Sequence, residues 1–462
     1  MVGFLFDSCK EKPEASKEKQ EASNFDVADQ IIKDIKVLEF ADNTFNIVDF
    51  GAVGDGETKN TQAIEEAIRV CNEAGGGKVV IPSGNFLTGP IHLKSNVNLH
   101  LEEGATVLFS KDKNDYLPVV HTSYEGMELM NYSPLIYAYK QSNIAVTGKG
   151  TFDGQANETN WWPWCGAPRY GYQEGDSQQR EEHNLPRLWK MSEDNVAVEE
   201  RLFGEGHQLR PTFFEPFECD NVLVEGVTFV NAPFWVIHPM KSNYVRVDGV
   251  TVRSHGPNND GCDPEYSKNV HITNCTFDTG DDCIAIKSGR NDDGRRVNIP
   301  SENIVVENCN MLDGHGGVVI GSEISAGVRN VFTRNCKMDS PNLDRAIRIK
   351  TNTVRGGFVE NVFVDNIQVG QVKEAVLKIN TYYGIYANQE GDYIPSIKDI
   401  HLENIQVENG GKYGVLIKGR PENPVKNVTL TNVHIKGVET PLSIENSEPL
   451  TFKNTTINGV EY

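Results

Sequence analysis

The sequence predicts an all-β solenoid, in which short strands stack coil upon coil into a parallel β-helix with a helical cap at its N-terminal end. Three observations predict it: a repeat of 22–38 residues, strand-like alternation inside each repeat, and one amphipathic helical segment before the first strands. The chain has 462 residues, of which 38% are hydrophobic and 24% charged, as is typical of a soluble globular protein.

The repeating unit is Asn or a small polar residue, alternating apolar residues, Asn or Gly, and a second short alternation, as in residues 221–229. Alternation with a period of two is typical of strands, and the Asn or Gly between them marks a bend. One such unit cannot bury a face alone, but stacked units can. Residues 143–152 form an early relative, and later units begin at Asn221, Tyr244, Asn269, Asn303, Asn330, Asn361, Asp399, Asn427 and Pro449.

A helix is predicted from Thr58 or Asn60, either of which can act as N-cap, to about Ala74. The glycines 75–77 end it. We expect this helix to cover the open end of the solenoid and protect its unpaired edge. Its apolar face consists of Ala63, Ile64, Ala67, Ile68 and Cys71.

The nine cysteines indicate packing rather than disulfide or metal chemistry. Cys275, Cys309 and Cys336 each follow an Asn at the same place in their units, so they should stack as an interior column. No Cys-x-x-Cys pair or metal-ligand cluster stands out, and we expect neither a metal ion nor another cofactor.

The formal net charge of −21 argues against nucleic acid as a partner, because proteins that bind it carry a basic surface. The charge is uneven along the chain. Residues 281–350 carry ten Lys or Arg and ten Asp or Glu, so this window is neutral and the remainder carries the whole excess. A locally positive cleft for an anionic ligand is therefore compatible with the composition.

We divide the chain into a leader and tether at residues 1–40 and a β-helix domain at 41–462. The short apolar run before Cys9 and the polar stretch after it resemble the end of a bacterial lipoprotein signal, with Cys9 as the lipidated residue. This predicts a periplasmic or cell-surface protein with a possible membrane tether. The alternative is a leader without such a role. No run of about 18 apolar residues occurs.

Charged side chains follow successive strands of the repeat. From Asp260 to Asp281 is 21 residues, from there to His315 is 34, and from His315 to Arg348 is 33, so each step is about one coil. Neighbouring strands lie about 4.8 Å apart, and these side chains should therefore line one groove. Adjacent acids such as Asp281 and Asp282 cost stability unless they have a task, which indicates catalysis.

The motifs in this groove resemble those of glycoside hydrolase family 28, the polygalacturonases. The opening residues 49–56 and the glycines 75–77 also look like the start of that family, and the resemblance covers roughly residues 45–457. It implies a single-stranded right-handed parallel β-helix. Asn259 stands where the family often has Thr. The motifs are Asn258-Asn259-Asp260-Gly261, Gly280-Asp281-Asp282, Gly314-His315-Gly316 and Arg348-Ile349-Lys350.

The resemblance implies hydrolysis of galacturonosyl linkages in pectic polysaccharide or oligogalacturonides, with inversion at the anomeric carbon. Asp281 would be the general acid, while Asp260 and Asp282 would hold and activate the water. His315 would tune the protonation of the acid. One point conflicts: inverting enzymes usually separate their carboxyls by about 6.5–9.5 Å, whereas one rung of a solenoid suggests the shorter spacing, about 5–5.5 Å, of retaining enzymes.

Substrate binding is assigned by the same resemblance. Arg348 would bind the substrate carboxylate through two guanidinium N–H groups, and Lys350 would bind it through its single ammonium charge. Asn258 is a further candidate, and Tyr382 or Tyr383, one coil further on, would contact the substrate.

A polar insert at residues 153–211 interrupts the repeat, and long inserts of this kind usually serve function. Its residues Trp161, Trp162 and Trp164 either stack on sugar rings or pack the loop down. The insert could also block one end of the groove and favour exo-action.

Other functions fit the same scaffold. Within the family, the substrate could be rhamnogalacturonan or xylogalacturonan, or the enzyme could release a terminal rhamnose. Outside it, a pectate lyase or a non-catalytic β-helix that binds polysaccharide remains open. The oligomeric state does not follow from the sequence.

Overall fold

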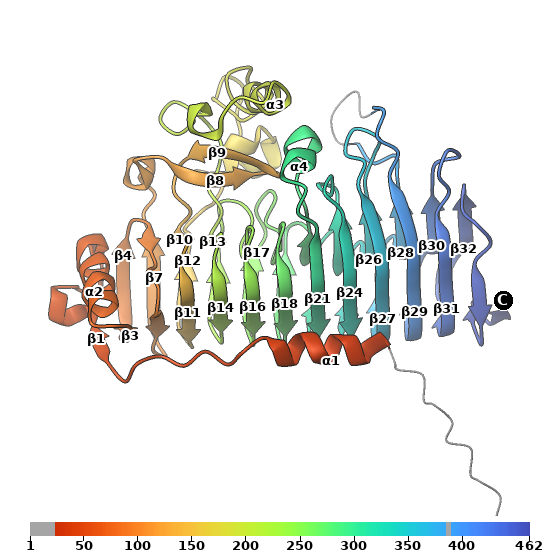
Figure 1. Cartoon of the computed structure of the whole chain (residues 1–462), viewed down its shortest axis with the longest axis horizontal. Helices are drawn as coiled ribbons and strands as arrows, with labels where there is room; N and C mark the ends of the chain where they lie inside the picture. The colour runs from red at the N-terminus through yellow and green to blue at the C-terminus, as the bar shows by residue number, and fades with distance from the viewer. Residues whose placement is uncertain (1–23, 385–389) are drawn as a thin grey trace, which may run out of the picture.

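Stacked strands run the length of the molecule in the computed structural model, which describes residues 24–384 and 390–462 (Figure 1). The strands form three columns in which neighbours pair in parallel. The first column is β1 (Thr44–Asn46), β3 (Gly77–Ile81), β6 (Val97–Leu101), β11 (Ser142–Gly148), β14 (Asp220–Glu225), β16 (Asn243–Asp248), β18 (Lys268–Thr273), β21 (Ser301–Glu307), β24 (Val328–Arg334), β27 (Phe358–Gln371), β29 (Ser396–Asn409), β31 (Lys426–Ile435) and β33 (Thr451–Lys453).

The second column lies beside the first across the Asn or Gly bend, and the last long strands β27, β29 and β31 take part in both. Its own members are β2 (Asp55–Lys59), β4 (Gly84–Thr88), β7 (Ala105–Phe109), β12 (Thr151–Asp153), β15 (Thr228–Val230), β17 (Thr251–Ser254), β19 (Thr276–Thr279), β22 (Asn310–Met311), β25 (Lys337–Asp339) and β34 (Thr456–Ile457), which pairs with β35 (Val460–Glu461).

The third column forms the opposite wall of the coil and carries the charged motifs. Single bridges through residues 237–240 and 262–265 connect its earlier and later strands. Its members are β5 (Ile91–His92), β10 (Ile136–Tyr139), β13 (Phe214–Phe217), β20 (Ile284–Ile286), β23 (Val318–Gly321), β26 (Arg345–Lys350), β28 (Ala375–Asn380), β30 (Gly411–Lys418) and β32 (Val438–Glu445). The predicted right-handed parallel β-helix is confirmed.

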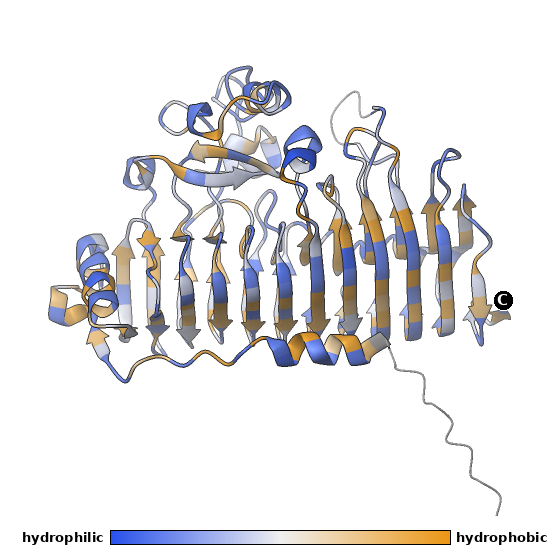
Figure 2. Ribbon diagram, in the orientation of Figure 1, coloured by the Kyte–Doolittle hydropathy of each residue, from blue (hydrophilic) through white to orange (hydrophobic). Residues whose placement is uncertain are grey.

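Apolar residues of equal register stack inside the coils, and Figure 2 shows their hydrophobic bands continuing from strand to strand. The rings of Phe152 and Phe229, for example, lie 5.4 Å apart in neighbouring coils. Cys275, Cys309 and Cys336 are buried free thiols that precede paired residues of β19, β22 and β25, which confirms the predicted interior column.

The predicted bends are occupied by asparagines in the left-handed region, such as Asn274 at φ 55° and Asn308 at φ 56°. The asparagine that begins each unit adopts the same conformation, as Asn269 does at φ 54° and Asn303 at φ 59°. Asparagine tolerates this conformation better than most residues. Each side chain also bonds the next coil: Asn303 Nδ2 donates to Asn269 Oδ1 and Asn330 Nδ2 donates to Asn303 Oδ1, both at 3.0 Å. The asparagines therefore form a ladder along the outside of the helix.

Helix α2 (Thr61–Glu73) covers the N-terminal end and buries Ile64, Ala67, Ile68 and Cys71, as predicted. Asn60 occupies the N-cap position, but its side chain bonds backbone groups of neighbouring segments, such as Val53 and Leu87, instead of the helix.

Helix α1 (Asn24–Asp34) lies within the stretch expected to be a leader and tether. It runs along the outer face of β18 and β21 (Figure 1), where Ala28 and Ile31 pack with Val305 and Phe332. Cys9 lies outside the described residues. None of the helices in the described ranges is long and apolar enough to cross a membrane.

The insert 153–211 lies above the third column together with the hairpin β8 (Val120–Tyr124) and β9 (Met127–Asn131) (Figure 1). Trp161 is fully buried, and the Trp162 indole N–H donates to the Ala232 carbonyl. The tryptophans thus pack the insert down. Its helices are η3 (Trp162–Cys165), η4 (Pro168–Tyr170), α3 (Leu185–Glu193) and η5 (Val198–Glu200), and α4 (Asn291–Val297) lies close to α3.

Candidate active site

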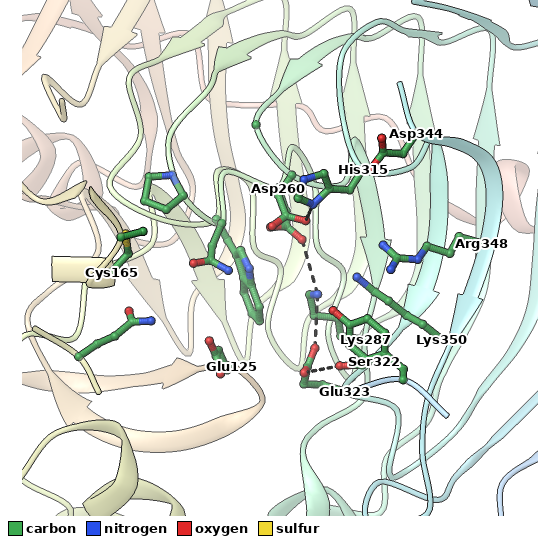
Figure 3. Close-up of a pocket in the computed structure, with 18 of the residues that line it drawn as sticks. Glu125, Cys165, Asp260, Lys287, His315, Ser322, Glu323, Asp344, Arg348 and Lys350 are labelled. Atoms are coloured by element: carbon green, nitrogen blue, oxygen red, sulfur yellow. Dashed lines mark hydrogen bonds and ion pairs between the residues drawn. The ribbon is translucent and has the colours of Figure 1, made fainter. Parts of the chain in front are cut away.

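A cavity of about 430 Å³ lies between the third column and the insert. The predicted residues converge on it from loops and strands of successive coils (Figure 3). Parallel pairing explains this convergence, because residues at the same place in each repeat share one edge of the sheet. Among its lining residues are the predicted Asn258, Asp260, Asp281, His315, Arg348 and Lys350.

Three carboxylates occupy the centre of the site. Oxygens of Asp260, Asp281 and Asp282 all lie within 4.8 Å of one another. Asp282 is fully buried, and Asp260 is 3% exposed. The spacing falls below the range usual for inverting glycosidases, so the conflict noted from the sequence persists in the structure.

Asp281 pairs with His315, whose Nδ1 lies 3.0 Å from Asp281 Oδ1. The Asp281 charge and this hydrogen bond raise the pKa of His315 to about 9. Burial opposes ionisation of Asp281, but His315 and then Lys350 outweigh it and hold the pKa of Asp281 below its usual value. Before a ligand binds, His315 is thus cationic and Asp281 is ionised.

Asp260 differs from Asp281. Burial, followed by the charges of Asp263 and Asp281, raises the pKa of Asp260 well above its usual value, although Lys287 opposes this effect. Its Oδ1 is buried and has no hydrogen-bond partner in the described part of the chain. Burial and the neighbouring carboxylates therefore favour the neutral form of Asp260.

Asp282 is held by the two cations of the last motif. Lys350 Nζ donates to Asp282 Oδ2 at 2.6 Å, and Arg348 Nη1 lies 3.5 Å from Asp282 Oδ1. Arg348 also keeps a buried Nε without a partner among the described residues. Both cations line the cavity and retain donor capacity for an anionic group.

The structure places Tyr383, not Tyr382, in the pocket, which corrects the assignment of Tyr382 to substrate binding. The ring of Tyr382 lies against the Arg420 guanidinium, 3.6 Å from its central carbon. Tyr383 lies near Arg348 and Lys350, at 5.4 and 5.3 Å from its ring centroid. Both residues follow the end of β28, where the chain bends, and the backbone N–H of Tyr383 donates to the Thr351 carbonyl.

Sequence analysis did not identify several charged residues that line the cavity. Lys287 follows β20, Glu323 follows β23, and both are largely buried. A buried charge at the end of an apolar strand is the signal that could have identified them. The other charged residues are Glu125, Arg290, Asp344, Arg345 and Arg355, together with Arg169 and Arg180 from the insert; Gln179 and the aromatic residues Tyr170 and Trp235 also line the cavity.

The three aspartates could also chelate a cation, since their oxygens lie close enough together. However, Lys350 already bonds Asp282 and the cationic His315 bonds Asp281, and both would repel a metal ion. A second group with suitable ligand atoms lies outside the pocket and consists of His255, Asp278 and Asp313.

Comparison with known proteins identifies the family. The model of glycosyl hydrolases family 28 matches residues 197–456, and a model named rhamnogalacturonase A/epimerase, pectate lyase-like, matches residues 44–105. The chain belongs to glycosyl hydrolases family 28.

Relatives within family 28 cover nearly the whole chain. An exopolygalacturonase from Thermotoga maritima is 43% identical, with a TM-score of 0.90 over 95% of this chain and 96% of that one. A probable polygalacturonase of Vitis vinifera is 28% identical over 84% of this chain and 74% of its own length. An exo-poly-alpha-D-galacturonosidase of Dickeya chrysanthemi is 28% identical over 90% and 71%.

This family-28 chain is therefore a glycoside hydrolase. Its pocket holds what such chemistry needs: carboxyls of different proton affinity beside cations that can orient an anionic sugar. One carboxyl is buried and favours its neutral form, and another is held ionised by neighbouring cations.

Proposed function

We propose that the protein hydrolyses α-1,4-galacturonosyl linkages of polygalacturonate or its oligomers from chain ends, with inversion. The arrangement that carries this proposal is a cavity lined by Asp260, Asp281, Arg348 and Lys350, with the buried Asp282 directly behind Lys350 and close to both other aspartates. The names of relatives such as the Thermotoga maritima exopolygalacturonase support the substrate and the exo-action. Family membership favours hydrolysis over the lyase and binding-only alternatives.

In this mechanism Asp281 protonates the leaving oxygen. The proton reaches it along the hydrogen bond from His315 Nδ1, 3.0 Å away. Substrate binding favours this transfer: a sugar carboxylate paired with Lys350 offsets the positive charge that lowers the pKa of Asp281 in the empty pocket. Asp281 therefore becomes protonated when substrate binds, which is when the general acid is needed.

Asp260 and Asp282 hold and activate the water. Asp282 accepts a hydrogen bond from Lys350 and lies near Arg348, and these contacts hold its carboxyl group in place. Asp260 must lose its proton to act as a base, and Lys287, 3.6 Å from its Oδ2, favours that ionisation. Arg348 and Lys350 also bind the substrate carboxylate, and Asn258 and Tyr383 complete the wall around it.

The insert supports exo-action. Arg169, Tyr170 and Arg180 line the cavity from this segment, which rises above the third column next to the site. A groove that is walled at one end admits a chain terminus more readily than the middle of a polymer. Release of short products from the first minutes, without a prior fall in polymer size, is the expected pattern.

Polygalacturonate incubated with wild type and Asp281→Asn tests the function. We expect reducing ends and a discrete short product from wild type, and a rate about 10²–10⁴-fold lower in the variant, as is typical of a lost general acid. Proton NMR identifies the anomer of the first product. Because the linkage is α, a β product indicates inversion and an α product indicates retention. Random mid-chain cleavage would contradict exo-action, and no release would contradict the substrate.

We further propose an extracytoplasmic location with Cys9 as a lipid attachment point, as the sequence motif around Cys9 suggests. A polymeric substrate outside the cell supports it. Fractionation of cells that express wild type or Cys9→Ser tests it. Membrane association that the substitution abolishes is the expected result, and equal distribution of both would contradict it.

A further inference from the structure

The ammonium group of Lys287 is an unused donor at the wall of the cavity. Within the described residues it makes no hydrogen bond: its nearest carboxylate oxygens are Asp260 Oδ2 and Glu323 Oε2, both at 3.6 Å, and Asp263 Oδ2 at 4.0 Å. The side chain is 3% exposed. The three carboxylates stabilise its charge, but none of these oxygens lies closer than 3.6 Å, so a ligand oxygen that accepts a hydrogen bond from Nζ gains affinity there.

The position of Lys287 is fixed by neighbours that leave its donors unfilled. Its Nζ lies 4.5 Å from the centroid of the Trp235 ring, which also lines the cavity. Arg355 Nη2 lies 3.4 Å from Glu323 Oε1, so Glu323 forms an ion pair with Arg355 as well as with Lys287. Figure 3 shows Lys287 between Asp260 and Glu323.

Sheet register makes Lys287 the counterpart of Lys350. Ile286 of β20 pairs with Ile320 of β23, which pairs with Ile349 of β26. The next residue in each strand is Lys287, Gly321 and Lys350, and Gly321 is paired directly with Lys350. The Ile-Lys pair of the last motif thus has a second copy two coils earlier.

The middle position of this column has no side chain. Gly321 has φ 106°, and a Cβ built there would lie 2.0 Å from the Lys350 carbonyl oxygen, so only glycine fits. Two rungs of about 4.8 Å place the backbones of the two lysines roughly 10 Å apart along the groove. Two cavity-lining cations in one column, with no side chain at the position between them, suit a ligand with repeated carboxylates.

We propose that Lys287 binds the carboxylate of the uronate on the opposite side of the scissile bond from the uronate held by Arg348 and Lys350. This inference rests on the proposed function and extends it. The enzyme binds the carboxylates of two consecutive sugars, one through Lys287 and the other through Lys350. Lys287 is then a specificity-determining residue, and its contacts with Asp260 place the reacting sugar next to the water-activating carboxylates.

The test uses binding rather than turnover. In the full-length Asp281→Asn background, calorimetry measures the dissociation constants of digalacturonate and of its two monomethyl esters, each blocked at one sugar. Lys287→Gln should weaken digalacturonate binding roughly 10- to 100-fold, the loss expected for a hydrogen bond to a charged group. Lys350→Gln is the matched control from the same column.

The esters separate a ligand contact from a structural role. Lys287→Gln should bind digalacturonate no better than one of the two esters, while it still discriminates against the other. Lys350→Gln should show the reverse pattern. Equal loss for all three ligands would overturn the proposal, because a residue that only holds Asp260 in place cannot distinguish the esters.

Two further outcomes are distinguishable. If the Asp281→Asn parent binds none of these ligands, the proposed function and the inference fail together; if it binds them and Lys287→Gln is indistinguishable from it, the inference alone fails. If Lys287→Gln does not fold, the double variant with Asp263→Asn removes a carboxylate that would lose its counter-ion. The dissociation constants of the double variant for the two esters are then interpreted in the same way.

Discussion

The asparagine ladder and the pocket are both rows of polar side chains that the coils hold in register, yet their hydrogen bonding differs. In the ladder each amide bonds the next coil, as Asn303 does with Asn269 and Asn330 at 3.0 Å. In the pocket Asp260 Oδ1 is buried without a hydrogen-bond partner in the described part of the chain, and so are both oxygens of the neighbouring, fully buried Asp263.

The difference separates stability from function. A satisfied polar row stabilises the stack, because every buried donor has an acceptor. A row with buried polar atoms that lack hydrogen-bond partners costs stability, but it leaves polar groups available to bind the substrate and water. Substitutions in the two rows should therefore have opposite consequences, and they are ordered below from the largest expected effect to the smallest.

Asp260→Asn should lower activity on polygalacturonate about 10²–10⁴-fold, since the proposed water-activating group is lost. The same change should raise the unfolding free energy by about 0.5–2 kcal/mol at pH 7. The reason is that the raised pKa of Asp260 makes wild type lose stability as pH rises above the ordinary carboxyl range. Thermal unfolding at pH 4 and pH 7 should show the gain only at the higher pH. Destabilisation at pH 7 would contradict this.

Asn303→Ala should lower the unfolding free energy by about 2–3 kcal/mol, because it breaks two ladder hydrogen bonds and puts alanine at φ 59°. Asn303→Gly is the matched control: glycine tolerates the backbone, so only the hydrogen-bond loss of about 1–2 kcal/mol remains. Denaturant unfolding measures both. Activity per folded molecule should match wild type, and a fall of tenfold would show that ladder and pocket are coupled.

The smallest stability effect is expected at His315, because its side chain is 42% exposed and solvent screens its ion pair: a pH-dependent difference between wild type and His315→Gln. The folded pKa of about 9 lies above the unfolded value of 6.5, so the contribution is fully present below pH 6.5 and is lost as pH rises through about 9. The stability of the variant must be subtracted from that of wild type at each pH, because the buried His238, between Glu215 and Glu265, also has a pKa raised to about 9 and contributes in both proteins. A difference independent of pH would contradict the ion pair with Asp281.

The sequence by itself determined the stack of coils. Alternation with period two, Asn at the bends and cysteines at matching places define which residues align, because a parallel sheet repeats its register from coil to coil. The same reasoning brought Asp260, Asp281, His315 and Arg348 into one groove, since their spacing follows the repeat.

Only the tertiary structure decided which other groups complete the pocket. Glu125, Arg169 and Arg355 come from loops or an insert whose lengths do not follow the repeat, so their positions depend on packing over the third column. The choice of Tyr383 over Tyr382 depends on how the chain bends after β28 ends at Asn380. Lys287 had the right register in the sequence, but its unused ammonium appears only when its neighbours are in place: hydrogen bonding is a property of distances between coils, which no spacing along the chain specifies.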